Sequence, residues 1–372
     1  MTIMNTRTTK NLRRSALLGA MVADATNRGR EAAPTASAIT NQSGVALITA
    51  VLITAIASMI AVSLIARQDL DIRRSSNVLD NDRAYVFALG AEGWVRHILN
   101  RDDRKKDSLD EDWAQTLPPI AVEGGQIAGR IEDLQARFNL NNLVSADGKQ
   151  NPAQVALFQR LLSALGLNPD IAIAAGDWVD EDVEPFFPGG AEDDEYSSLP
   201  SPYRAANRPF ASPSELRLVK GMTAEAYAAL APYITALPVR TAINVNTAAP
   251  PVLAAVVGEL TSHNLTPEDA EEIVMRREEQ SFNNTDDFLN SDLIRTSGGK
   301  AVSRGPPAQP AGTTGAGAGQ QQLTADAISV TSEYFLLTAA AEYGQRGKVM
   351  VFTAFTRRGG KVAVLWRSQG VY

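Results

Sequence analysis

The stretch QSGVALIT, residues 42–49, opens an apolar run that continues to Ala66. Residues 45–66 contain no charged side chain over 22 positions. At about 1.5 Å per residue, a helix of this length spans roughly 33 Å, which is enough to cross a bilayer core. The apolar core of a secretory signal peptide is shorter, about 7–15 residues. The run therefore predicts a single membrane-spanning helix over residues 45–66.

The charge of the chain changes sign at the start of this run. The first 44 residues carry a net charge of +4, whereas the whole chain of 372 residues carries −7, which leaves −11 on the remainder. By the positive-inside rule, the basic leader places the N-terminus in the cytoplasm and the body outside it. An acidic body argues against bulk nucleic-acid binding, which draws on a surplus of Lys and Arg.

The composition is that of an ordinary globular protein, with 44% hydrophobic and 21% charged residues. The chain has no cysteine, which excludes disulfides and thiol catalysis. Its two histidines, His97 and His263, leave little basis for histidine catalysis or for a zinc site.

A helical pattern continues beyond the apolar run. Ile72, Leu79 and Val86 recur every seven residues, and no proline occurs from Val45 to Leu117. We therefore expect one helix from Val45 to about Asn100, on the order of 80 Å long, whose apolar seam packs against partner helices. A membrane anchor followed by a separate juxtamembrane helix is the alternative.

Two regions have the pattern of β-structure. Gly124-Gly125 is a turn signal before a predicted strand over residues 126–134, which indicates a short hairpin. Near the C-terminus, residues 327–342, 348–356 and 361–367 are rich in Val, Phe, Tyr and Thr and are separated by Gly-containing turns. These three segments predict an antiparallel meander.

The sequence between the two strand regions is predominantly helical. Helix-start signals of the N-cap and capping-box type occur at Asn151-Pro152, Ser212-Pro213-Ser214-Glu215, Thr223, Thr247 and Thr266-Pro267. Residues 298–322 are rich in Gly, Pro, Ala and Gln, so we expect a flexible loop there.

An acidic segment interrupts this helical part. Carboxylates cluster at Asp177, Asp180, Glu181, Asp182 and Glu184, and again over residues 192–195 after Pro188-Gly189-Gly190. So many carboxylates repel one another unless they are solvated or neutralised by a cation. Oxygen ligands without nearby His or Cys would suit calcium, although EF-hand spacing is absent. A solvated acidic loop and a calcium site both remain open on these residues alone.

The same carboxylates could in principle serve a glycosidase. The only aromatic residues around them are Trp178, Phe186, Phe187 and Tyr196, which do not form the signature of an aromatic-rich sugar cleft. We therefore expect no enzyme activity, and a calcium-dependent enzyme outside the cytoplasm is the disfavoured alternative.

Residues 243–248, continuing through Phe282 to Phe288-Leu289, resemble a helix-hairpin-helix module of the DNA-uptake kind. DNA-binding modules present a Gly-hydrophobic-Gly hairpin to a phosphate. The segment between the two helices, residues 257–262, has one glycine and an acidic residue, and Lys220-Gly221-Met222 is similarly incomplete. We predict a structural or partner-binding insert. A signal-anchored DNA-uptake protein is the alternative function.

Four stretches together carry a family resemblance. QSGVALIT resembles the class III leader of type IV pilin-like proteins. IEDLQARFNLN (131–141), PGGAEDD (188–194) and PYRAAN (202–207) resemble the general secretion pathway protein K family, the minor pseudopilins of the type II secretion system. The resemblance covers about residues 42–370.

The resemblance implies processing by prepilin peptidase, with cleavage after Gly44 and methylation of the new N-terminus at Val45. The leader is longer than is usual in the family, which leaves the translation start open. The resemblance also implies an inner-membrane protein with a single pass and a periplasmic body. Its implied partners are the I and J minor pseudopilins and the major pseudopilin, in a tip complex that primes pseudopilus assembly for export of folded proteins across the outer membrane.

The resemblance further implies calcium in the helical domain. The candidate ligands are Asp177, Asp180, Asp182, Glu192, Asp193 and Asp194. No nucleic acid is expected among the partners.

The fifth position of the implied mature chain is Thr49, where most pilins carry glutamate. A lone carboxylate at bilayer depth costs at least a few kcal/mol unless it is paired. A subunit with no predecessor in the filament gains nothing from that carboxylate, so threonine suits a subunit that goes first. A tolerant helix position is the alternative interpretation.

The predicted fold is α+β: a type IV pilin-like long N-terminal helix, a small antiparallel sheet and a large all-helical inserted domain of helix-hairpin-helix or SAM-like type. The predicted parts are a leader (1–44), the transmembrane half of the helix (45–66), the first pilin-like part (67–144), the helical insert (145–325) and the closing sheet (326–372).

Overall fold

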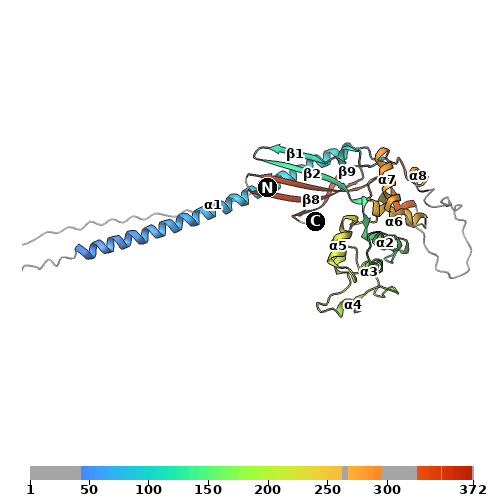
Figure 1. Ribbon diagram of the computed structural model, residues 1–372, viewed down its shortest axis with the longest axis horizontal. Coiled ribbons are helices and arrows are strands. Elements are labelled where there is room, and N and C mark those ends of the chain that lie inside the picture. Colours follow the sequence, from blue (N-terminus) through green and yellow to red (C-terminus); the bar gives the residue numbers. More distant parts are fainter. Residues whose placement is uncertain (1–42, 262–266, 293, 295–324, 345, 371–372) are drawn as a thin grey trace, which may run out of the picture. The chain divides into compact units, whose positions relative to one another are not determined.

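The computed structural model describes residues 43–261, 267–292, 294, 325–344 and 346–370 (Figure 1). The chain divides into two compact units, Met1–Gln68 and Asp69–Tyr372. The predicted loop over residues 298–322 and the helix-start signal at Thr266 lie outside the described residues, as does the leader up to residue 42.

Helix α1 runs without interruption from Ser43 to Arg101. The prediction of one continuous helix is confirmed, and the alternative of a separate juxtamembrane helix is wrong. In the first unit every described side chain is exposed, including the large apolar ones. Thr49 Oγ1 donates to the carbonyls of Val45 and Ala46 at 3.0 and 2.9 Å, so this hydroxyl is satisfied within the helix. By length and composition this helix could cross a membrane.

Five antiparallel strands form the main sheet, in the order β1-β2-β7-β8-β9. Their bounds are β1 (Leu117–Val122), β2 (Gly125–Asp133), β7 (Tyr334–Tyr343), β8 (Gly347–Arg358) and β9 (Lys361–Gln369). The predicted hairpin at Gly124-Gly125 is confirmed. Strands β2 and β7 are neighbours although the whole helical part separates them in sequence, so that part is inserted between adjacent strands (Figure 1).

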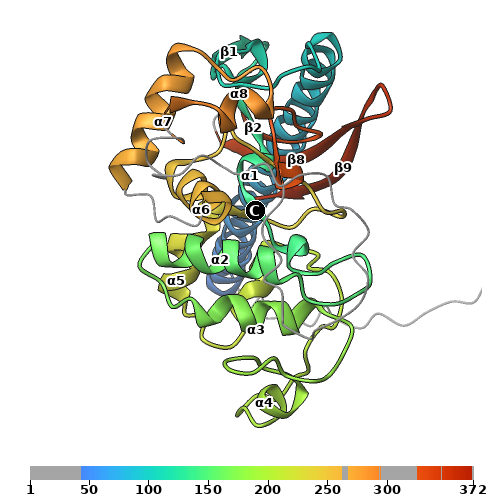
Figure 2. The same cartoon turned by 90° about the vertical axis from the view of Figure 1, so that its right-hand side faces the viewer.

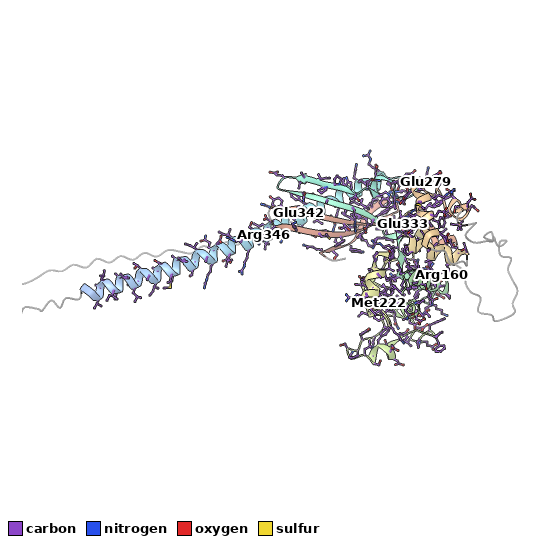
Figure 3. All side chains as sticks on the ribbon, in the orientation of Figure 1. Arg160, Met222, Glu279, Glu333, Glu342 and Arg346 are labelled. Carbon is purple, nitrogen blue, oxygen red and sulfur yellow. The ribbon has the colours of Figure 1, made fainter. Side chains whose placement is uncertain are left out.

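The first C-terminal strand begins later than predicted. The sequence pattern places its start at residue 327, but β7 starts at Tyr334. Two residues labelled in Figure 3 help to locate it: Glu333 directly precedes the strand and Glu342 is its next-to-last residue. Ile328–Ser329 instead forms β6, which pairs in parallel with β5 (Ile243–Asn244). A second two-residue parallel pair joins β3 (Phe138–Asn139) to β4 (Ile234–Thr235). These short pairs attach the inserted helices to the chain on either side of them.

The second half of α1 packs on the main sheet through small and aliphatic side chains. Ala84, Ala88, Val95 and Leu99 are buried in one cluster with sheet residues such as Phe355. The alanines allow a close approach between helix and strands. At the turn between β7 and β8 the approach is closest, because a Cβ at position 347 would lie 2.5 Å from the Asp80 carbonyl oxygen. Glycine is therefore required there.

One polar side chain of α1 is buried against the sheet. Glu92 accepts hydrogen bonds from Thr353 Oγ1 at 2.9 Å and from Arg367 Nη2 at 2.7 Å. A buried carboxylate is tolerated only when it is paired in this way. These bonds tie α1 to strands β8 and β9.

The inserted part contains seven described α-helices (Figure 2). Their bounds are α2 (Pro152–Ala164), α3 (Asp170–Val179), α4 (Asp193–Ser197), α5 (Ala224–Leu230), α6 (Pro250–Thr261), α7 (Pro267–Glu279) and α8 (Thr285–Leu289). Short 3-10 turns occupy Asp112–Ala114, Leu134–Ala136, Leu140–Leu143, Pro213–Leu218, Ala231–Tyr233 and Ala325–Ala327.

These helices share one apolar core. Phe138 and Phe158 stack at its centre, with ring centroids 4.9 Å apart, and α2 packs closely on α6. Arg160 of α2, labelled in Figure 3, reaches across to Glu259 of α6 at 2.7 Å. The core also takes in Ile328. Buried side chains on both sides of the predicted 145–325 insert thus belong to the helical core, and the boundaries stay a prediction.

The helix-start signals have mixed outcomes. Asn151 caps α2 and Thr223 caps α5, as predicted. The capping box at Ser212 forms, but it opens a 3-10 helix. The helix expected from Thr247 begins at Pro250, because Asn244 and Thr247 are held in buried hydrogen bonds to Asp133.

The helix-hairpin-helix interpretation also needs a correction. The sequence pattern makes residues 257–261 part of a connection between two helices, but they belong to α6, which ends at Thr261. The connection to α7 therefore falls on residues 262–266, outside the described part of the chain. Gly221 does form a turn before α5, with a φ of 81°.

Candidate cation site

The acidic segment is placed by the end of α3 and the start of α4. Asp177 lies in the last turn of α3, Asp180 is its C-cap, and Glu192 directly precedes α4. Asp177, Asp180 and Glu192 are buried, whereas Asp182 is exposed. These three carboxylates are therefore buried in the helical part, although α3 contains no basic residue that could neutralise them.

Asp177 shapes the backbone of the segment. Its Oδ2 accepts the backbone N–H of Phe186 at 3.1 Å and of Ala191 at 2.8 Å, and its Oδ1 accepts a hydrogen bond from Gln150. A Cβ on Gly190 would collide with the same carboxylate, so the chain can pass this close only as glycine. Burial raises the pKa of Asp177, and these hydrogen bonds oppose that rise.

Asp180, Asp182 and Glu192 form a compact group, in which one oxygen from each lies within 4.8 Å of the others. Asp180 and Glu192 are each only 4% exposed. Within the described part of the chain, Asp180 Oδ1 and both Glu192 carboxylate oxygens find no hydrogen-bond partner. Buried polar atoms are nearly always paired, so these three oxygens need an explanation.

The pKa shifts of Asp180 and Glu192 are also those expected of carboxylates that lack a positive partner. Burial, followed by repulsion from neighbouring carboxylates, raises the pKa of Asp180 and of Glu192 to about 7. No described Lys or Arg forms an ion pair with Asp180, Asp182 or Glu192. A divalent cation with a preference for oxygen ligands would pair the orphaned oxygens and offset the repulsion. The donor set therefore fits calcium.

The other two predicted ligands lie apart from this group. Asp193 accepts the backbone N–H of Ala205 at 3.0 Å and lies 3.8 Å from Arg204. Asp194 is exposed on α4. Of the six predicted ligands, the structure brings together Asp180, Asp182 and Glu192, and it gives Asp177 a supporting position beside them.

A second group of carboxylates was not predicted from the sequence. Asp102, Asp107 and Glu111 also lie within 4.8 Å of one another, between the end of α1 and the sheet. Here Arg357 of β8 pairs with two of the three carboxylates, with Nη1 2.6 Å from Asp102 and Nη2 2.6 Å from an oxygen of Asp107. Glu111 accepts from Trp113 Nε1 at 2.7 Å. No local sequence signal marks this group, because its cation comes from far along the chain.

The predicted processing site lies at the start of α1. Gly44 and Val45 are its second and third residues, and both are exposed. Thr49 follows one turn later. A Cβ at position 44 would meet no described atom within 4 Å, so packing does not account for this glycine.

Comparison with known proteins now adds to this geometry. Residues 136–239 and 243–304 match family models described as type II secretion system (T2SS), protein K. The type II secretion system protein K of Pseudomonas aeruginosa is 36% identical over 88% of this chain and 93% of its own length. The chain belongs to the type II secretion system protein K family. The proteins of the same name from Aeromonas hydrophila and Pectobacterium carotovorum are 34% and 37% identical over 65% and 59% of this chain, and over 77% and 72% of their own lengths.

A solved structure extends the protein K match to three dimensions. The crystal structure of the GspK-GspI-GspJ complex from enterotoxigenic Escherichia coli contains a chain that superposes with a TM-score of 0.65 and 26% identity, over 80% of this chain and 100% of that one. The predicted pilin-like α+β fold is confirmed. This protein K is a minor pseudopilin, anchored by the single apolar helix that the structure describes.

Proposed function

We propose that this protein K acts at the tip of the type II secretion pseudopilus, where it primes assembly together with I-type and J-type minor pseudopilins. The observation that carries the proposal is the match to the chain in the GspK-GspI-GspJ complex over 80% of this protein. The exposed side chains of Ile72, Leu79 and Val86 supply an apolar stripe for partner helices. Thr49 supports a first-subunit role, since its hydroxyl is satisfied inside α1 and needs no partner amine.

The partner proposal is tested by coexpressing this chain with the I-type and J-type proteins encoded in the same genome. We expect the three to copurify from detergent as one complex. Leu79→Asp and Val86→Asp together should abolish copurification, because they place charge in the apolar stripe. Met275→Asp, at an exposed position on α7, is the matched control. The proposal would be contradicted if the unsubstituted chain purified without the I-type and J-type proteins.

The proposed orientation has a cytoplasmic N-terminus, an inner-membrane helix and a periplasmic body. It is supported by the basic leader before α1 and by the apolar side chains of residues 45–66. Prepilin peptidase would cleave after Gly44 and leave an N-methylated Val45. Mass spectrometry of the N-terminus of the mature protein tests this step, and an intact leader would contradict it.

The group Asp180, Asp182 and Glu192 is the proposed calcium site, with Asp177 holding the surrounding backbone. Calcium would neutralise the buried carboxylates and so fix the segment between α3 and α4. This role is structural, and no reaction is assigned to the site. Support for a non-enzymatic protein comes from the family, whose members are components of a secretion system.

A further inference from the structure

The segment that joins α3 to α4 exposes large apolar side chains next to the carboxylate group. Val183 is 66% exposed, Phe186 is 53% exposed and Phe187 is 91% exposed. Figure 2 shows α3 and α4, with the segment between them, at one edge of the helical part. We call residues 183–188 the phenylalanine loop. Full burial of one such phenylalanine is worth about 1.5–3 kcal/mol, so this surface forgoes a large stabilisation in the free chain.

The phenylalanine loop has a defined backbone. Asp177 Oδ2 holds the N–H of Phe186, the N–H of Gly190 donates to the Phe186 carbonyl at 2.8 Å, and the N–H of Glu184 donates to Asp182 Oδ1 at 2.9 Å. Below it, Trp178 of α3 packs edge-on against Tyr196 of α4, with centroids 5.2 Å apart. The apolar side chains are therefore presented on a backbone that is fixed before any partner arrives, which lowers the entropic cost of binding.

The exposed charges on the phenylalanine loop and directly before it are all acidic, although at α4 Glu195 pairs with Lys220 and Asp193 lies 3.8 Å from Arg204. Glu181, Asp182 and Glu184 are exposed on the loop or beside it, and Asp194 and Glu195 are exposed on α4. No Lys or Arg occurs in the sequence between Arg160 and Arg204. An anionic lipid surface would be repelled by this rim, and so would the same rim on a second copy of the chain. A partner with a basic rim would be attracted.

We propose that the phenylalanine loop is a docking surface for another protein, whose receiving pocket is apolar at its floor and lined by Lys or Arg at its edge. Phe187 enters the pocket, and Glu181 and Glu184 face the basic edge. An exposed aromatic anchor within a rim of charge is the arrangement expected of an interface hot spot. The loop conformation rests on the contacts of Asp177 and Asp182, and the proposal does not depend on the proposed tip complex.

The test uses the full chain in the bacterium that produces it, with a photo-cross-linking phenylalanine analogue at position 187 and, as control, at the exposed position 275 of α7. We expect a protein adduct at position 187 that the control does not give. The captured protein is then purified and its affinity for the full chain is measured in detergent. Phe187→Ala should weaken binding roughly 10-fold or more, and Met275→Ala should leave it unchanged.

Two further variants test the rest of the proposal. Phe187→Trp should retain binding, since it keeps an aromatic anchor. Glu181→Lys with Glu184→Lys should weaken binding at low salt and remove most of its salt dependence, because the attraction to a basic edge is screened by ions. The absence of an adduct specific to position 187, an adduct with lipid or with a second copy, or binding insensitive to Phe187→Ala or to the double reversal would each overturn the proposal.

Discussion

Two groups of three carboxylates lie in the described part of the chain, and they differ in whether a basic side chain pairs with them. In the group of Asp102, Asp107 and Glu111, the two aspartates pair with Arg357, which is itself almost completely buried. Asp180, Asp182 and Glu192 are equally close together, but the described residues supply no basic side chain to them. The first group is a closed structural junction between α1 and the sheet. In the second group, Asp180 Oδ1 and both Glu192 carboxylate oxygens have no described hydrogen-bond partner, which supports the proposal that it takes a cation from solution.

The causes of the pKa shifts show the same difference. Burial raises the pKa of Asp107 to about 7, against the opposing effect of the Arg357 guanidinium. Burial also raises the pKa of Asp180 to about 7, but there the neighbouring Asp182 and Asp177 add to the rise. Close carboxylates therefore mark a ligand site only when no internal cation is present. That distinction needs the three-dimensional structure.

The largest expected effect comes from removing the positive charge of Arg357 from the group of Asp102, Asp107 and Glu111. Arg357→Met should lower the free energy of unfolding by about 3–5 kcal/mol, since it leaves Asp107 buried without its charge partner. Urea unfolding of the detergent-solubilised chain, followed by tryptophan fluorescence, measures the change. Arg358→Met is the matched control, because its ion pair with Glu333 is exposed and should be worth at most about 1 kcal/mol. Equal effects of the two substitutions would contradict the comparison.

A second effect on stability is expected from calcium binding at the group of Asp180, Asp182 and Glu192. At a concentration 100 times its dissociation constant, calcium should raise the free energy of unfolding by about 2.7 kcal/mol, and a chelator should reverse the gain. Glu192→Gln should abolish the calcium effect. Glu195→Gln should preserve it, because Glu195 pairs with Lys220 and lies outside the group. A calcium response that survives in Glu192→Gln would place the metal elsewhere.

The stability of the chain should also depend on pH, and this dependence should change when calcium is present. Because the folded pKa values of Asp180 and Glu192 lie above those of the unfolded chain, the folded state binds more protons between about pH 4 and 7. Calcium-free protein should therefore lose stability as the pH rises from 5 to 8, by about 1.4 kcal/mol for each tenfold difference in proton affinity between the folded and the unfolded chain. The variant Asp180→Asn/Glu192→Gln should show a shallower slope in chelator. A slope unchanged by the two substitutions would exclude these groups as its source.

The smallest effect is expected from a substitution of Asp194, which lies outside the group of Asp180, Asp182 and Glu192. Asp194→Asn should change calcium affinity by less than about threefold and unfolding by less than about 0.5 kcal/mol, as is usual for an exposed position. Isothermal titration with calcium measures the affinity. A loss comparable to that in Glu192→Gln would mean that the α4 carboxylates join the site when the ion binds.

Local signals were enough to predict much of the fold and the clustering of three of the six candidate ligands, whose role in calcium binding stays a prediction. A proline-free stretch with an apolar residue at every seventh position was enough to predict α1, and glycine turns were enough for the main hairpins. Asp180, Asp182 and Glu192 lie within one short segment, so their clustering could be recognised. Asp193 and Asp194 belong to the same acidic run, but Asp193 accepts the backbone N–H of Ala205 and Asp194 is exposed on α4, so neither joins the group of Asp180, Asp182 and Glu192. Sequence proximity could not show that.

Long-range partners account for the features that were missed. Arg357 meets Asp107 across 250 residues, and Ile328–Ser329 leaves the predicted strand because Ile243–Asn244 competes for it as a parallel partner. Thr247 looks like a helix start, yet its hydroxyl binds the buried Asp133 at 2.6 Å, and the helix begins later. Each error occurred where tertiary contacts override a local preference.

The bonds from Glu92 to Arg367 and Thr353 have a consequence for filament geometry, because they fix the rotation of α1 about its own axis on the sheet. The side chains of Ile72, Leu79 and Val86 therefore point in set directions. Positions seven apart drift about 20° per repeat around a straight helix, so this stripe winds gradually in a left-handed sense. Helices that pack along such a stripe commonly cross at about +20°. One buried carboxylate thus contributes to the supercoil angle at which neighbouring subunits can join.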